Sequence, residues 1–432
     1  MLSRTVVGLV ASLVLVAACS AGTPAKVIRI GVDLPLSGAE GRAGQTALNG
    51  VQFFVHQHPT IGAFSVQVVA QDDAVGGVDD PGQGTHNINA LAADPLVMGL
   101  IGPFNASVAR REIPLANDAH LAMISPAVSS RCLTKEPFLP AGLSRTHVAI
   151  SCKAVGLPTP LELRPTGINN FFRLVTTDDL QGPAAADYGY KNLLLRRVAV
   201  LSDHEAYGQA LASGFMTRFT KLGGSIVDSF DFDPNSHLDL TAFMRHAKGD
   251  GAQAIYYGGV TANHGCVIRA QMASVFSPGE AAPFLGGDGI AKDPNCVRNA
   301  GANAVGIYAT VAAAAPDIIP NAQPVITAFK AQYRNASDYS EYTIPAYDSV
   351  AILYGAIDRA LTAAGGKVPA RDAVVGQVAA TSGFTGASGT FGFDGAGDTT
   401  LRVLSVFESR TSDPALPWSF VRAVDYSAAL PY

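Results

Sequence analysis

Strand-like and helix-like segments alternate along this chain in two successive series, and no other feature restricts the possible fold as strongly. The first series opens with a buried apolar strand at residues 27–33, followed by a helix at 45–58 whose apolar residues recur at helical spacing. Strands that alternate with helices form parallel sheets covered by helices on both faces. We therefore predict an α/β protein. The other expected strands are 64–71, 96–101, 121–125, 197–202, 225–230, 254–257, 284–286 and 305–314, and the other expected helices are 86–93, 106–119, 180–195, 207–222, 241–248 and 263–274.

The length of the chain requires more than one hydrophobic core. It has 432 residues, and single cores stop growing well below that size. Between the two series lies an irregular stretch at 128–170, rich in Pro, Ser, Thr and Gly, which we interpret as an insertion pinned by a disulfide. We predict lobe I at 27–173 and 314–387, and lobe II at 174–313 and 388–432. The tail is expected to hold helices at 325–334, 344–364 and 370–380, and a β pair formed by 389–393 and 400–408 around a turn.

The N-terminal residues have the pattern of an export signal. A basic start at Arg4 precedes a short apolar run, and small residues come after it, which is typical of a secretory signal and too short for a membrane span. The sequence Val16-Ala17-Ala18-Cys19 resembles a bacterial lipobox. That resemblance implies removal of residues 1–18, a lipid on Cys19, a tether at 19–26 and an extracytoplasmic protein anchored to the membrane only through lipid. The alternative is an ordinary signal peptide with an incidental cysteine.

Composition excludes one class of partner. Charged residues make up 15% of the chain, the formal net charge is −5, and basic residues never cluster beyond a pair. A nucleic-acid partner is therefore not expected.

Four further cysteines remain in an oxidising compartment, where even numbers usually pair. Three pairings are possible. We favour Cys132–Cys152 and Cys266–Cys296, because both close local loops and neither fixes the two lobes together. No cysteine spacing matches a zinc site, so no metal is expected.

A set of short motifs, in order along residues 27–410, resembles the type I periplasmic solute-binding proteins, and more narrowly the leucine/isoleucine/valine-binding group. The opening strand and loop, Ile30 to Gly38, carry this resemblance first. Each of the motifs is weak alone, and their order and spacing carry the match. The others are Leu100-Ile101-Gly102-Pro103, Ile124-Ser125-Pro126-Ala127, Phe172-Arg173, Asp179-Leu180-Gln181-Gly182, Ala206-Tyr207-Gly208-Gln209, Tyr257-Gly258-Gly259, Gly286-Gly287-Asp288-Gly289, Tyr347-Asp348 and Phe393-Asp394-Gly395.

This resemblance implies two Rossmann-like lobes with parallel central sheets, joined by a hinge of three crossovers, that close on a small ligand. It implies an amino acid as ligand, branched-chain or similar, and delivery to the permease and ATPase subunits of an ABC importer. We expect a monomer without a cofactor.

The resemblance also implies where such a ligand would bind. A ligand carboxylate suits the loops that enter helices, where Asn105, Ser107, Ala127 (through its backbone) and Ser129 are candidates. Asn105 and Ser107 could instead simply cap the helix that follows. The ligand ammonium suits Asp288, with Tyr207 beside it, although Asp288 could be a plain turn residue and Tyr207 an ordinary half-buried one.

The chain departs from the family pattern at two positions. Ala106 stands where a serine is usual, and Val260 where an aromatic ring is frequent, so the pocket is expected to differ from that of a leucine receptor. Ser37, Val260 and His264 are possible residues of the cleft rim, with a loop role as the alternative for Ser37 and a helix-start role as the alternative for His264.

Two rival functions stay open on sequence grounds. A secreted hydrolase lacks support, since no Gly-x-Ser-x-Gly, Gly-Lys-Ser/Thr or His-Glu-x-x-His motif occurs. We therefore do not expect an enzyme. A sensory protein that binds amides or other small organic acids would use the same fold, because a fold does not determine which partner responds to the bound ligand.

Overall fold

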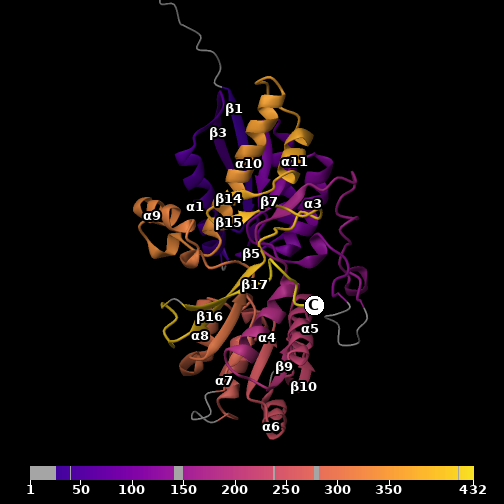
Figure 1. The fold of residues 1–432 in the computed structure, drawn as a ribbon, viewed down its shortest axis with the longest axis vertical. Helices are drawn as coiled ribbons and strands as arrows, with labels where there is room; N and C mark the ends of the chain where they lie inside the picture. The colour runs from indigo at the N-terminus through magenta and orange to yellow at the C-terminus, as the bar shows by residue number, and fades with distance from the viewer. Residues whose placement is uncertain (1–25, 39, 141–148, 237–238, 277–281, 417) are drawn as a thin grey trace, which may run out of the picture.

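Two β-sheets, each covered by helices, make up the computed structural model, which describes residues 26–38, 40–140, 149–236, 239–276, 282–416 and 418–432. They occupy the upper and lower halves of Figure 1. The first sheet has the order β2-β3-β1-β6-β7-β8 and the second the order β10-β9-β11-β12-β13-β16-β17. The strands of the first sheet are β1 (Val27–Leu34), β2 (Thr60–Ile61), β3 (Phe64–Asp72), β6 (Val97–Ile101), β7 (Met123–Ser125) and β8 (Phe171–Arg173); the second sheet holds β9 (Arg197–Ser202), β10 (Ser225–Asp231), β11 (Ala254–Gly258), β12 (Phe284–Gly286), β13 (Ile307–Val311), β16 (Val403–Ser409) and β17 (Ser419–Asp425).

Parallel pairing dominates both sheets, and the antiparallel strands lie at their edges. In the first sheet only β2 is antiparallel, to β3. In the second, β16 pairs antiparallel with β13 and β17 with β16. The α/β prediction with parallel central sheets is therefore confirmed, with mixed edges as a refinement.

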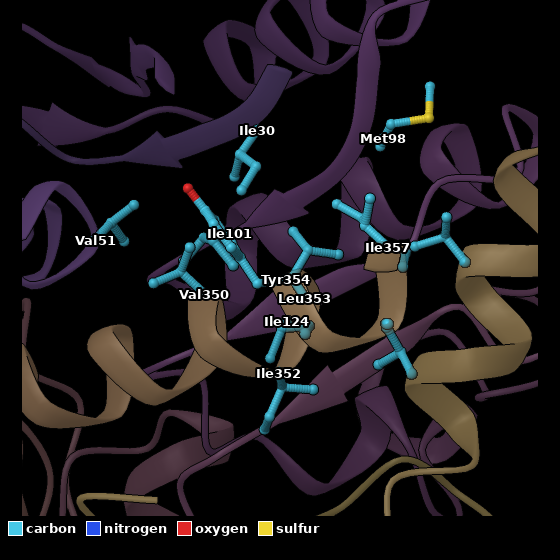
Figure 2. Packing of buried hydrophobic residues seen from close by; sticks show 14 of the residues in the cluster. Ile30, Val51, Met98, Ile101, Ile124, Val350, Ile352, Leu353, Tyr354 and Ile357 are labelled. Carbon is cyan, nitrogen blue, oxygen red and sulfur yellow. The ribbon is translucent and has the colours of Figure 1, made fainter. Parts of the chain in front are cut away.

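Helix α10, which lies far from β1 in the sequence, contributes much of the hydrophobic core on one face of the first sheet. The alternate residues Ile28, Ile30 and Val32 of β1 are fully buried and pack with α1, α10 and α11 (Figure 2). Burying an aliphatic side chain of this size contributes about 1.5–3 kcal/mol. The opposite pleat, with Val97 and Leu100, packs against α2 and α3. The helices of this half are α1 (Gly41–Gln57), α2 (Pro81–Ala93), α3 (Ala106–Asp118), α9 (Ala322–Gln332), α10 (Thr343–Ala363) and α11 (Arg371–Ala379).

The second sheet is covered in the same way. One face packs on α4 and α5 through residues such as Phe215, and the other face on α6, α7 and α8 through residues such as Met244. The helices are α4 (Gln181–Lys191), α5 (Ala206–Lys221), α6 (Thr241–Gly249), α7 (Gly265–Met272) and α8 (Pro294–Ala300).

The chain crosses between the two sheets three times, after β8, after β13 and before β16. The crossings are hydrogen-bonded to each other: the Thr176 amide donates to the Ala312 carbonyl at 2.9 Å, and the Ala315 amide to Ser405 Oγ at 2.6 Å. Because these bonds join segments that are distant in sequence, the three crossings form one connected hinge region.

A buried ion pair ties the first crossing to the third. Arg173 is fully buried, and its Nε lies 2.7 Å from Asp398 Oδ1, while Lys135 Nζ lies 2.7 Å from Asp398 Oδ2. Burial acts to raise the pKa of Asp398, but the two cations outweigh it and hold the pKa well below its usual range. The carboxylate is therefore charged at all physiological pH values.

Some sequence predictions of local structure are wrong. Residues 389–393 and 400–408 do not form a β pair: β15 (Gly389–Phe391) pairs with β14 (Phe384–Gly386), and β16 joins the second sheet, where β13 offers it a buried partner. A single antiparallel bridge joins Phe393 to Thr399, which lies just before the second predicted strand.

Several elements have no counterpart among the predicted ones, and helix α2 starts earlier than expected. The unpredicted elements are the short strands β2, β4 (Ala74–Val75), β5 (Val78–Asp79), β8 and β14, the helix α8 and the edge strand β17. Helix α2 starts at Pro81 and not at residue 86, because the Asp80 side chain accepts a hydrogen bond from the Gln83 amide at 2.7 Å and proline suits the first helical turn.

Both predicted disulfides, Cys132–Cys152 and Cys266–Cys296, are present. The lobe boundaries stay a prediction. Phe391 packs in the core of the first sheet, so we propose that the last return to lobe II comes after residue 391 and not after 387. The lipobox and Cys19 lie outside the described residues. In the part of the chain that the structure describes, no helix has both the length and the apolar character needed to cross a bilayer.

Candidate functional site

The second sheet brings two of the predicted binding residues into direct contact. Tyr207 lies in the first turn of α5, and Asp288 comes just after β12. The Tyr207 hydroxyl donates a hydrogen bond to Asp288 Oδ1 and accepts one from the Gly289 amide at 3.0 Å. Burial raises the pKa of Asp288, and the hydrogen bond from Tyr207 counteracts part of that increase. The pair places the half-buried residue Asp288 at the carboxyl end of the parallel strands, where ligands of open α/β sheets bind.

The glycines around Asp288 allow this close approach. A Cβ at Gly287 would lie 2.8 Å from the Tyr207 hydroxyl and 2.5 Å from a Leu211 methyl carbon. A Cβ at Gly289 would lie 2.8 Å from Val260 Cγ1. The Gly-Gly-Asp-Gly motif therefore serves packing around the carboxylate, and Val260 lines the same corner.

Gln181 is a neighbour of Asp288 that the site prediction omitted. Its Oε1 accepts a hydrogen bond from the Asp288 amide at 3.1 Å, while its buried Nε2 has no hydrogen-bond partner among the described residues. A buried N–H group without a partner costs free energy, so a ligand acceptor would be favoured beside it. Gln181 stands in one of the motifs that carry the family resemblance, and this was the signal that could have identified it.

On the side of the first sheet, the predicted carboxylate-binding residues are already engaged by acidic side chains. Asn105 Nδ2 donates to Glu40 Oε2 at 2.8 Å, and Ser107 Oγ donates to Asp79 Oδ2. The buried Asn105 Oδ1 has no partner among the described residues. A ligand carboxylate would have to displace Glu40 or Asp79 to reach these donors, so their role stays a prediction.

The two halves meet near Asp288. Tyr342, just before α10, packs its ring edge-on against Phe104 with centroids 4.7 Å apart. Burial raises the pKa of Tyr342, and the charges of Asp288 and Glu40 add to that shift. Beside this group, Lys292 Nζ lies 2.6 Å from Glu341 Oε2 and joins the halves by an ion pair. No sequence pattern pointed to Tyr342 or Glu40, because only the tertiary structure brings them to Asp288.

The loop after β7 holds the remaining candidates of the first half. The Ala127 amide donates to Ser125 Oγ at 3.2 Å, so it is used within its own loop. The Ser129 carbonyl accepts a hydrogen bond from the Asp178 amide at 2.9 Å. Burial raises the pKa of Asp178 to about 7, and the charges of Asp179 and Asp288 add to that shift. Ser129 therefore contacts a residue, Asp178, whose pKa is affected by the charge of Asp288.

Two of the three predicted rim residues, Ser37 and His264, have structural partners. Ser37 is exposed and hydrogen-bonds Asp72. His264 has a left-handed backbone (φ 67°) immediately before α7, and its Nε2 lies 3.0 Å from the Pro234 carbonyl oxygen. These contacts account for both residues without a ligand.

A cluster of three acidic residues, one of which belongs to β1, is fully buried in the first half of the molecule. Asp33, Asp73 and Glu112 are each 0% exposed, and among the described residues Asn87 Nδ2 donates to Asp33 Oδ1 at 2.8 Å. Burial raises the pKa of Asp33 to about 6, that of Asp73 to about 8, and that of Glu112 well above its usual value. Asp73 therefore remains largely protonated at neutral pH, because an unpaired buried charge is costly.

Comparisons with known proteins agree with this architecture. A family model described as periplasmic binding protein matches residues 27–413. Leu/Ile/Val-binding protein homolog 2 of Brucella abortus is 27% identical over 398 residues, covering 91% of this chain and 93% of the relative. An amino acid binding protein of Pseudomonas aeruginosa is 24% identical and covers 75% of this chain and 77% of the relative.

Solved structures show the same fold. A leucine binding protein of Thermotoga maritima is 22% identical, with a TM-score of 0.70 over 92% of this chain and 99% of that one. A solute binding protein of R. palustris, in complex with 4-hydroxybenzoate, is 17% identical, with a TM-score of 0.70 over 93% of this chain and 97% of that one.

Proposed function

The chain belongs to the periplasmic binding protein family, and on this premise we propose that it binds a small solute between its two sheets, an amino acid above all. The observation that carries the proposal is the Tyr207–Asp288 pair, a carboxylate held at the carboxyl end of the second sheet. An ammonium group that reaches Asp288 would gain a charge-assisted hydrogen bond in a partly desolvated corner. Relatives named as Leu/Ile/Val-binding proteins support an α-amino acid.

Aromatic acids are the ligand class to test against it. A structural neighbour is a complex with 4-hydroxybenzoate and another a complex with 3,4-dihydroxybenzoic acid. Neither ligand has an ammonium group, so neither would need a charged Asp288. The Glu40 and Asp79 carboxylates beside Asn105 and Ser107 also favour a ligand with a positive group over a simple anion.

A ligand panel with two variants tests the proposal. Thermal shift with the wild-type protein should identify an amino acid that raises Tm, because a ligand that binds only the native state stabilises it. Asp288→Asn should then weaken binding by roughly 2–5 kcal/mol, measured by calorimetry. Asp293→Asn is the matched control: it removes a charge from the same loop, and asparagine caps α8 as well as aspartate does. Benzoate binding that is indifferent to Asp288→Asn would reject the amino-acid proposal.

Localisation and delivery complete the proposal. We propose that the mature protein is extracytoplasmic, lipid-anchored at Cys19, and presents its ligand to an ABC permease with its ATPase. Mass spectrometry of the protein from membranes should find a diacylglyceryl group on an N-terminal Cys19. Release of the Cys19→Ala variant into the soluble fraction would support the anchor, and an unmodified, uncleaved N-terminus would reject it.

A further inference from the structure

The insertion after β7 crosses from the first half of the molecule to the second. Its disulfide Cys132–Cys152 lies in a buried apolar cluster with Phe138 and Leu139, and this cluster also contains Ala210 of α5. Cys132 and Cys152 are 2% and 0% exposed, so the contact is a packed one. In Figure 1 the described parts of this insertion, drawn in magenta, run along the side of the molecule from the upper half toward α5.

Polar contacts of Arg131, at the start of the insertion, also join the first half of the molecule to the second. Arg131 NH1 lies 2.8 Å from Asp179 Oδ2, and the Asp179 side chain is fully buried. The Arg131 amide donates to Asp178 Oδ1 at 3.1 Å. Asp178 and Asp179 open the turn that runs directly into α4, so they belong to the second half. Arg131 Nε also donates to the Pro137 carbonyl at 2.7 Å, which fixes the segment to its own base.

We propose that residues 131–139 and 150–157 form an interlobe clasp that favours the closed arrangement of the two halves. Separating the halves would pull the cluster off Ala206 and Ala210 and expose apolar surface that is buried in the clasp. It would also leave the buried Asp179 carboxylate without its counter-charge. The clasp meets α5 on either side of Tyr207, so closure and the geometry of the Tyr207–Asp288 pair are linked.

The clasp should influence the apparent affinity for the ligand through the fraction of molecules that are closed. If ligand binds the closed arrangement, the apparent dissociation constant is the intrinsic one divided by the closed fraction. A weakened clasp lowers that fraction, and ligand dissociation should accelerate on the order of tenfold, within the usual range of coupling between two sites. This part of the inference rests on the proposed function, whereas the closed shape does not.

Two disulfide variants provide a matched comparison. Cys132→Ser/Cys152→Ser removes the disulfide of the clasp, and Cys266→Ser/Cys296→Ser removes one that lies wholly within the core of the second half. Small-angle scattering without ligand should show a larger radius of gyration for the first variant only. The second should lower Tm and leave the radius of gyration unchanged.

If the Cys132→Ser/Cys152→Ser variant does not fold, a third variant tests the clasp independently. Ala210→Glu places a charge in the apolar cluster without touching the disulfide, and Ala210 is not part of the core beneath α5. It should open the molecule in the same way, with helical content unchanged by circular dichroism. A folded Ala210→Glu protein with the wild-type radius of gyration would overturn the clasp. Because scattering uses no ligand, a failed ligand panel would refute the proposed function and leave this result standing.

Discussion

Removing the charge of Asp398 should destabilise the hinge strongly. Asp398→Asn keeps the shape of the side chain but leaves the fully buried Arg173 guanidinium without its counter-charge. Breaking a buried ion pair from one side typically costs about 3–5 kcal/mol. The remaining acceptors of Arg173 include the Val128 and Ser130 carbonyls at 3.2 and 2.7 Å, which carry only partial charges and do not replace a carboxylate.

The expected change in Tm depends on the size of the unit that unfolds. For a unit of about 200 residues, 1 kcal/mol corresponds to roughly 2–4 °C, so Asp398→Asn should lower Tm by roughly 6–20 °C. Calorimetry or circular dichroism at pH 7 measures it. Asp394→Asn is the control: Asp394 also lies by Lys135, at 2.8 Å, but is 26% exposed, and its loss should cost at most about 1 kcal/mol.

The pH dependence gives an independent check on the same pair. The pKa of Asp398 is lower in the folded than in the unfolded protein, so its stabilisation is present above the unfolded value of about 3.9 and is lost as the pH falls through and below it. The difference in Tm between wild type and Asp398→Asn should therefore shrink from pH 6 to pH 3. Equal effects of the two Asn variants at pH 7 would refute the reasoning, since they would show that burial of the pair carries no extra energy.

Three further outcomes are expected. Burial raises the pKa of Asp73 to about 8, so its contribution to the free energy of unfolding is largest below its unfolded pKa of about 4 and falls as the pH rises toward 8. Asp73→Asn should therefore flatten the fall in Tm between pH 5 and pH 8, and an unchanged slope would contradict this reasoning. Gly287→Ala should weaken ligand binding at least about tenfold (1.4 kcal/mol), because its methyl group would displace the Tyr207 hydroxyl, and a calorimetric dissociation constant equal to the wild-type value would show that the pair tolerates the shift. Burial raises the pKa of Asp288, so ammonium binding should weaken as the pH falls toward 4, and titrations at pH 7 and pH 4.5 that agree would remove the charged carboxylate from the site.

Much of the fold could be predicted from the sequence because its determinants are local. The buried alternation in β1, the helical period of α1 and the order of strands and helices each depend on a window of about ten to twenty residues. The two disulfides were predictable for a similar reason, since both close short loops. Tyr207 and Asp288 were predicted from motifs that carry the family resemblance, the first at the start of a helix and the second at the end of a strand.

The tertiary structure decided what depends on long-range neighbours. The period of α10 shows that it is a helix, but only packing shows that it covers β1, at the other end of the chain. β16 has the pattern of a strand, yet its partner is β13 and not β15, because the free edge of the second sheet buries it better. No local sequence pattern indicates the raised pKa values of Asp73 and Glu112. Nor does one indicate that Asn105 donates a hydrogen bond to Glu40, or that the insertion packs against α5. The sequence by itself therefore determined most of the elements and their order along the chain. The packing of distant segments determined which charges are buried, which donors are available to a ligand, and where the halves touch. The physical reason is that the energies of burial and of paired charges depend on what surrounds a group in space.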